Sequence, residues 1–217
     1  MPRALLTELC PQRALIFRIV HRDNLPWLLD NGLHCPSSRT ANPSYVSIGN
    51  PDLIDKRQGK AVPISPHGML SDYVPFYFTP FSIMLLNIKT GRHGLTRRSS
   101  SEIVILVSSV HELNRRNIPF IFTDGHAYAK ESSFWSDISR LDMIDWNILQ
   151  RRDFTRDNED IGKTTRYQAE ALIHKFLPVD ALRGIVCHDE TEASNAQSLL
   201  TQRNLELKVI AKPGWYF

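Results

Sequence analysis

One histidine follows directly on an apolar run of strand length. Residues 15–20 (LIFRIV) end in the polar cluster His21, Arg22, Asp23 and Asn24, where a short helix is expected to begin. Backbone N–H groups at a helix start favour phosphate and ribose oxygens, so these side chains suit a nucleotide site. The alternative is a histidine that caps the helix or lies at the edge of the core.

Three further residues could serve sugar and base chemistry. Glu170 lies in the apolar stretch QAEALI, where a carboxylate must be paired, hydrogen-bonded or facing a cavity, unless it lies on the exposed face of a helix. Arg57 stands between Lys56 and Lys60, a pattern that favours a solvated helix face. His126 follows a short strand in the turn TDGH, which is either an ordinary Asp-Gly turn or a loop that carries the imidazole to a ligand.

The common catalytic and cofactor motifs are absent. The sequence has no G-x-G-x-x-G, G-x-x-x-x-G-K-[ST], G-x-S-x-G or H-E-x-x-H. Cys10, Cys35 and Cys187 have neither metal-ligand spacing nor the number that a disulfide framework needs. We therefore expect no metal, and any nucleotide must be bound by a scaffold other than a Rossmann fold or a P-loop.

Composition narrows the class of protein. The 217 residues, 42% hydrophobic and 23% charged, are typical of one globular domain. The net charge of +3 is a weak indicator, but 18 of the 26 basic residues are Arg, the planar donor that suits phosphates and base faces. A phosphate-bearing partner and an ordinary solvated surface both fit. No apolar run approaches the roughly 18 residues of a membrane span, and a signal peptide pattern is missing, so we expect a cytoplasmic protein with no membrane partner.

The expected elements alternate irregularly, which predicts an α+β fold rather than a doubly wound parallel sheet. Pro75 lies inside one expected strand and places that strand at a sheet edge or at a bulge. Residues 167–176 fit either a helix or a strand. We expect strands at 15–20, 73–79, 102–107, 119–122, 184–187 and 205–210, and helices at 24–29, 52–58, 82–89, 110–117 and 191–202.

Long irregular stretches separate these elements. Residues 1–13 are expected to form a loosely ordered lead-in. Residues 33–70, rich in Pro, Ser, Asn and Gly, are long enough to indicate a functional or disordered loop. Residues 127–165 mix short helices with polar loops.

The segments LIFRIVHRDNLPWLLDNGLH, DYVPFYFTPFSIMLLNI, EIVILVSS, PFIFTDGHA and RYQAEALI, in this order, resemble the DarT family. These proteins are bacterial DNA ADP-ribosyltransferase toxins paired with the macrodomain antitoxin DarG. The resemblance runs from about residue 15 to the final GWYF and is nearest to the thymidine-modifying branch. It implies a single ADP-ribosyltransferase-like domain over residues 1–217, with a split mixed β-sheet around an NAD cleft.

The resemblance also implies site residues. Residues 42–59 correspond to the NAD-binding element and residues 126–170 to the substrate loop, with His126 facing DNA. Arg57 takes the position of the catalytic arginine, which also contacts NAD, and Glu170 that of the catalytic glutamate on a strand of the cleft. The further NAD contacts implied are His21, Arg22, Asp23, Asp30 and Ser38, and the DNA-binding candidates among the basic residues are Arg92, Arg152, Arg156 and Arg166.

The implied activity is transfer of ADP-ribose from NAD to a base of single-stranded DNA, with thymine N3 as the acceptor. Transfer to guanine, RNA or protein and a DNA-binding module without activity are the alternatives. Single-stranded DNA, NAD and a DarG antitoxin are the expected partners. Gly125 stands where relatives carry Ser, and Ile83 where Pro is frequent; neither change removes a charge.

Overall fold

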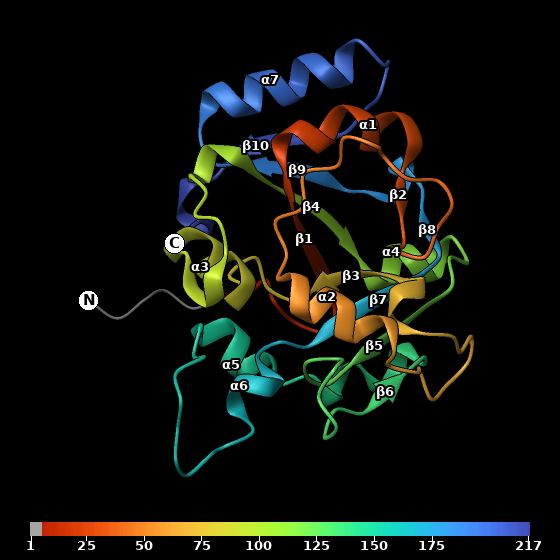
Figure 1. Ribbon diagram of the computed structural model, residues 1–217, viewed down its shortest axis with the longest axis vertical. Coiled ribbons are helices and arrows are strands. Elements are labelled where there is room, and N and C mark those ends of the chain that lie inside the picture. Colours follow the sequence, from red (N-terminus) through yellow and green to blue (C-terminus); the bar gives the residue numbers. More distant parts are fainter. Residues whose placement is uncertain (1–5) are drawn as a thin grey trace.

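The computed structural model describes residues 6–217, and its centre is a sheet of eight strands (Figure 1). The strand order is β10-β9-β4-β1-β3-β7-β5-β6, and a second, two-stranded sheet pairs β2 with β8. The sheet is mixed because β9 and β10 run parallel while the other paired strands run antiparallel. The strands are β1 (Leu15–His21), β2 (Leu33–His34), β3 (Tyr73–Tyr77), β4 (Ile103–Ser109), β5 (Phe120–Thr123), β6 (Phe134–Trp135), β7 (Glu170–His174), β8 (Phe176–Leu177), β9 (Gly184–Cys187) and β10 (Lys208–Ala211).

The sheet splits between β1 and β3. Strand β1 pairs along its whole length with β4, but it meets β3 only where Phe17 lies opposite Tyr77. Pro75 lies where the two strands have separated, and its carbonyl accepts a hydrogen bond from Arg18 Nη1 at 2.8 Å. Because the nitrogen and carbonyl of a strand residue face the same neighbour, the missing N–H of Pro75 falls on the open side. The expectation that Pro75 marks an edge or a bulge was therefore wrong: β3 is central, and the split accommodates the proline.

Helices surround this sheet (Figure 1). Two of them, α1 and α7, lie side by side at one end of the molecule, while α2 covers the region where β1 and β3 part. Local capping explains several boundaries: Ser82 Oγ accepts from the Leu85 N–H at the start of α3, and Gly32, with φ of 76°, ends α1. The helices are α1 (Leu25–Asn31), α2 (Pro51–Gln58), α3 (Ile83–Thr90), α4 (Val110–Arg115), α5 (Trp146–Arg151), α6 (Lys163–Arg166) and α7 (Glu190–Thr201).

The segment before β1 is better packed than the sequence predicts. Leu9 is buried, and Gln150 on α5 donates its side-chain amide to the Leu9 carbonyl at 2.9 Å. The Leu6 N–H in turn donates to the Gln150 carbonyl at 3.2 Å. The prediction of a loosely ordered lead-in was therefore wrong for residues 6–13, because helix α5, which is distant in the sequence, supplies hydrogen-bond partners for their backbone. Residues 1–5 lie outside the described part of the chain.

The fold class is confirmed, since the described residues form a single-domain mixed α/β structure with a split mixed sheet. The stretch that fitted either helix or strand contains strand β7, which lies between β3 and β5. Its first four residues are buried because β3 and β5 flank it on both edges and core residues cover its faces. Within residues 6–217, no helix combines the length and the apolar character that crossing a bilayer requires.

Candidate functional site

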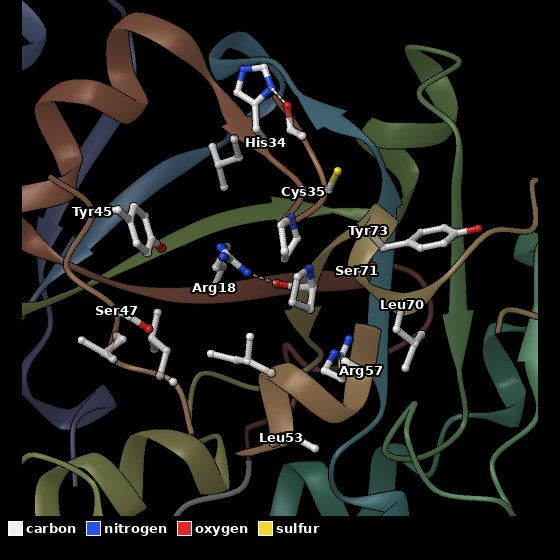
Figure 2. Close-up of a pocket in the computed structure, with 18 of the residues that line it drawn as sticks. Arg18, His34, Cys35, Tyr45, Ser47, Leu53, Arg57, Leu70, Ser71 and Tyr73 are labelled. Carbon is white, nitrogen blue, oxygen red and sulfur yellow. Dashed lines mark hydrogen bonds between the residues drawn. The ribbon is translucent and has the colours of Figure 1, made fainter. Parts of the chain in front are cut away.

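A cavity of about 420 Å³ opens where β1 and β3 separate. Its floor comes from β1 and β3, and its walls come from α2 and the preceding loop of residues 35–50. Figure 2 shows Arg18 reaching into it from β1 and Arg57 from α2, with Tyr45 on the loop opposite. The volume falls in the range of small-molecule sites.

Glu170 lies at one end of this cavity with 1% of its surface exposed. Its Oε1 accepts from Arg57 Nη1 at 3.1 Å and from the Ala127 N–H at 2.9 Å, while Oε2 lies 3.0 Å from Arg57 Nη2. Burial opposes the charged carboxylate, but the charge of Arg57 and these hydrogen bonds outweigh it, so the pKa of Glu170 lies below its usual value. The cavity therefore contains a buried carboxylate that is ionised at neutral pH.

Arg57 comes to Glu170 from the last turn of α2. Asn50 caps this helix by accepting from the Leu53 N–H, and Pro51 occupies its first turn. The side chain of Arg57 is 13% exposed. Burial lowers the pKa of Arg57, but the charge of Glu170 and the hydrogen bond to it raise that pKa by a larger amount, so the pKa lies above its ordinary value. The expectation of a solvated face was wrong for Arg57, although its neighbour Lys56 is exposed.

Arg18 is a cavity residue that the sequence analysis missed. It lies in the middle of β1, lines the cavity, and donates one N–H to the Pro75 carbonyl. Among the described residues no carboxylate pairs with it, whereas Arg57 is neutralised by Glu170. The signal was present in the sequence, because a cation within the apolar run LIFRIV needs a polar partner or a cavity.

His126 and Tyr77 complete the surroundings of Glu170. Burial, the largest effect, and the charge of Arg57 lower the pKa of His126, so the imidazole is neutral at pH 7. Its Nδ1 accepts from the Tyr128 N–H at 3.3 Å, which places the ring proton on Nε2. Burial and the charge of Glu170 raise the pKa of Tyr77 to about 12, so the phenol keeps its proton.

The NAD contacts implied by the resemblance divide into two groups. Ser38 and Arg57 line the cavity. His21 is the last residue of β1, Arg22 and Asp23 follow it, and none of the three is among the residues that line the cavity. Their role as NAD contacts stays a prediction.

These three residues and Asp30 have structural partners of their own. His21 is buried and caps the following 3₁₀ turn, because its Nδ1 accepts from the backbone N–H two residues later at 3.2 Å. Arg22 pairs with Glu192 on α7 at 2.8 Å. Asp30 forms a two-pronged pair with Arg203, at 2.7 and 3.0 Å, which ties α1 to the end of α7.

The basic candidates for DNA binding also differ in their surroundings. Arg92 and Arg156 are exposed. The guanidinium of Arg152 lies 3.7 Å from the ring centroid of Phe81, which stacks it against the core. Arg166 pairs with two aspartates, Asp145 at 3.1 Å and Asp160 at 2.6 Å. Arg92 and Arg156 are therefore accessible to a phosphate, whereas Arg152 attaches residues 126–170 to Phe81 and Arg166 connects two aspartates within that stretch.

Within residues 6–217, no group of three or more His, Cys, Asp or Glu side chains could hold a metal ion. The charges at the cavity are those of its own arginines and Glu170.

Comparison with known proteins identifies the family. The family model described as "ssDNA thymidine ADP-ribosyltransferase, DarT" matches residues 17–217. A protein of Escherichia coli O127:H6 named DNA ADP-ribosyl transferase is 53% identical over 210 residues, covering 97% of this chain and 96% of that protein. A relative in Thermosipho africanus, named a DNA ADP-ribosyl transferase-DNA ADP-ribosyl glycohydrolase fusion protein, is 23% identical over 95% of this chain and 50% of its own length.

Solved structures agree with the sequence match. Thermus sp. 2.9 DarT in complex with ADP-ribosylated ssDNA has a TM-score of 0.87 and 28% identity, with full coverage of both chains. The same protein in complex with NAD+ has a TM-score of 0.83 and 29% identity, covering 95% of this chain and 99% of that one. The match in sequence spans nearly the whole chain, and the match in structure spans all of it. This chain belongs to the DarT family.

Proposed function

We propose that this protein transfers ADP-ribose from NAD to a thymine base of single-stranded DNA and releases nicotinamide. One observation carries the proposal: Glu170 is buried in a cavity, yet Arg57 holds it ionised. The family description and the Thermus structures with NAD+ and with ADP-ribosylated ssDNA support the same reaction.

Glu170 is placed to stabilise the positive charge that develops on a ribose as its bond to nicotinamide breaks. NAD supplies the ADP-ribosyl group and the leaving nicotinamide. A fixed, buried carboxylate stabilises this charge more than it stabilises the ground state, which is what accelerates a reaction. Arg57 and the Ala127 N–H hold both carboxylate oxygens before substrate arrives.

Arg57 also acts on the acceptor base. The bond between ribose C1′ and nicotinamide breaks, and a bond between C1′ and thymine N3 forms while N3 loses its proton. Arginine stays protonated, because its ordinary pKa lies above about 12 and its pairing with Glu170 raises it here. Arg57 therefore favours the deprotonated base by its positive charge, and the proton leaves to water.

The chain's residues fit NAD as the co-substrate. Arg18, between the Glu170 end of the cavity and the end lined by Trp27 and His34, is the lining arginine that no carboxylate neutralises. The diphosphate of NAD would find its counter-charge at Arg18, and Trp27 and His34 would offer ring faces to adenine. Ser38 adds a hydroxyl on the loop that forms the wall.

The acceptor strand approaches from the side of His126. Thymine N3 is engaged in Watson–Crick pairing in a duplex, so an unpaired strand supplies the base at less cost. The neutral His126 offers its Nε2–H to a base carbonyl. Arg92 and Arg156 are exposed and can contact phosphates, while Arg152 and Arg166 hold the loop.

The resemblance also leads us to propose the biological setting. We propose a toxin that acts in the cytoplasm, where it would meet its DNA substrate. A DarG-type macrodomain antitoxin is the partner we propose, and the name of the Thermosipho fusion protein, which joins a transferase to a glycohydrolase, supports it.

The test uses single-stranded oligonucleotides that each lack one of the four bases. Mass spectrometry after incubation with NAD should show a gain of one ADP-ribose on every oligonucleotide except the one without thymine. Glu170→Gln should slow the transfer by about 10²- to 10³-fold and leave DNA affinity within a few-fold. Glu112→Gln is the matched control, since Glu112 is also paired with arginines, Arg115 and Arg116, but does not line the cavity.

Three outcomes would contradict the proposal. Adducts on the thymine-free oligonucleotide would point to guanine or another base. Label that enters RNA or protein instead of DNA would identify a different acceptor polymer. DNA binding without any adduct would make the protein a binding module.

A further inference from the structure

A tight turn connects β5 to the substrate loop and touches Glu170 twice. Thr123, the last residue of β5, is fully buried; its Oγ1 accepts from the Glu170 N–H at 3.1 Å and donates to the Gly125 carbonyl at 2.6 Å. Two residues after Gly125, the Ala127 N–H donates to Glu170 Oε1 at 2.9 Å. One hydroxyl thus connects the backbone of the glutamate to the turn that binds its carboxylate.

The substrate loop holds the other side of this turn. The His126 N–H donates to the Thr165 carbonyl at 3.0 Å, and Ser132 Oγ donates to the His126 carbonyl at 2.9 Å. A Cβ built on Gly125 would lie 2.7 Å from Ser132 Oγ and 3.2 Å from the Thr165 carbonyl oxygen. The turn therefore has no room to move outward, and the Thr123 hydroxyl fixes it on the inward side.

Resting on the proposed function, we propose that Thr123 is a positioning residue for the transfer reaction: its hydroxyl holds the Ala127 N–H against the carboxylate of Glu170. The contact leaves the carboxylate in one orientation toward the ribose. Thr123 does not line the cavity, so it acts through Ala127 and Glu170 and does not touch substrate. A displacement of a reacting group by about 1 Å is enough to lower a rate by about 100-fold.

Loss of the Thr123 hydroxyl should raise the pKa of Glu170, an effect that a purely structural role of Thr123 would not produce. The titratable groups that face Glu170 are Arg57 on α2, His126 on the turn and Tyr77 on β3, and none of them contacts Thr123 by a side-chain bond in the described residues. Burial raises the pKa of Glu170, while Arg57 and the Ala127 N–H are among the groups that lower it. If the amide moves away, the carboxylate loses a donor to its charged form, and its pKa rises.

The experiment compares Thr123→Val, which removes the hydroxyl at nearly constant volume, with Thr123→Ser, which keeps it. Thr123→Val should lower kcat by about tenfold or more, leave the KM for NAD within about threefold, and move the acid limb of the pH profile upward by about half a unit or more. Thr123→Ser should restore all three quantities to near those of the unchanged protein. A carbon-13 titration of the Glu170 carboxyl group measures the same pKa without any turnover.

Thr79→Val is the matched control. Thr79 is another buried threonine whose hydroxyl accepts a backbone N–H, from Phe81 at 3.2 Å, and it does not line the cavity. An equal loss of kcat in Thr79→Val, a change confined to KM, or an unmoved Glu170 titration in Thr123→Val would overturn the inference. If Thr123→Val does not fold, Gly125→Ala displaces the same turn from its outer side and should give the same losses.

Failure of the two proposals can be told apart. If the unchanged protein makes no ADP-ribosylated DNA, the proposed function fails. The carboxyl titration then still decides whether Thr123 positions Glu170, because it reads the contact directly.

Discussion

Removing Arg57 should destabilise the protein in a way that depends on pH. Glu170 is 1% exposed, and three of its close contacts come from Arg57 and Ala127. Removal of one partner of a buried ion pair costs about 3–5 kcal/mol, because the other charge stays buried without compensation. In Arg57→Ala the Ala127 N–H remains and the cavity admits water, so we expect the lower end, about 3 kcal/mol at pH 7.

The sign of the pH dependence follows from the direction of each pKa. In the unchanged protein the pKa of Glu170 is below its usual value, so the pair stabilises the fold above the unfolded pKa of about 4.3 and loses this effect as pH falls. In Arg57→Ala the effect of burial is no longer outweighed by the arginine, so the pKa rises above the unfolded value. The variant is then destabilised at neutral pH and recovers as pH falls and Glu170 takes up a proton. The difference in unfolding free energy between the two proteins should shrink between pH 7 and pH 5.

Urea unfolding followed by tryptophan fluorescence measures this difference at each pH. The double variant Arg57→Ala, Glu170→Gln should recover part of the stability at pH 7, because it removes the charge that Arg57→Ala leaves unpaired. A loss below about 0.5 kcal/mol, or a loss that is the same at pH 7 and pH 5, would refute the coupling of Glu170 to Arg57.

The remaining predictions concern NAD binding, DNA binding and thermal stability. Arg18→Ala should raise the KM for NAD about tenfold with a smaller change in kcat, measured by steady-state kinetics, because it removes a phosphate contact made before and during the reaction. Asp30→Ala should leave the KM for NAD unchanged, since its partner is Arg203 and it does not line the cavity; an increase of several-fold would show that it contacts NAD. Arg156→Ala should reduce the salt dependence of single-stranded DNA binding by about 0.7 in log–log slope, whereas Arg166→Ala should lower the thermal midpoint instead, as filter binding and thermal melts would show.

Helices and strands whose boundaries are set by residues close in the sequence could be predicted from the sequence. Ser82 begins α3 and Gly32 ends α1, because a cap acts on residues within one turn of the chain. Strand β4 could be predicted from the composition of its apolar run alone. The stretch that became β7 could not be assigned, since its apolar residues fit both periods until β3 and β5 flank it.

The candidate site depended on contacts between distant parts of the chain. Arg57 and Glu170 are 113 positions apart, and nothing near Arg57 indicates a buried partner, because its helix has no fully buried residue. The resemblance to the DarT family supplied that pair. The same resemblance implies NAD contacts at His21, Arg22 and Asp23, which stay predictions, while the residue of β1 that sequence reasoning missed, Arg18, lines the cavity three positions before His21.

Arg18 and Pro75 are both unusual residues for the interior of a sheet, and the structure shows that they contact each other. An arginine in an apolar strand needs a polar partner, and a proline in a central strand lacks an N–H that the neighbouring strand would use. The contact of Arg18 Nη1 with the Pro75 carbonyl gives the arginine a polar partner, and the separation of β1 from β3 removes the need for an N–H at Pro75. Two local exceptions on paired strands are therefore a sequence signal for a split in a sheet, and here that split holds the site.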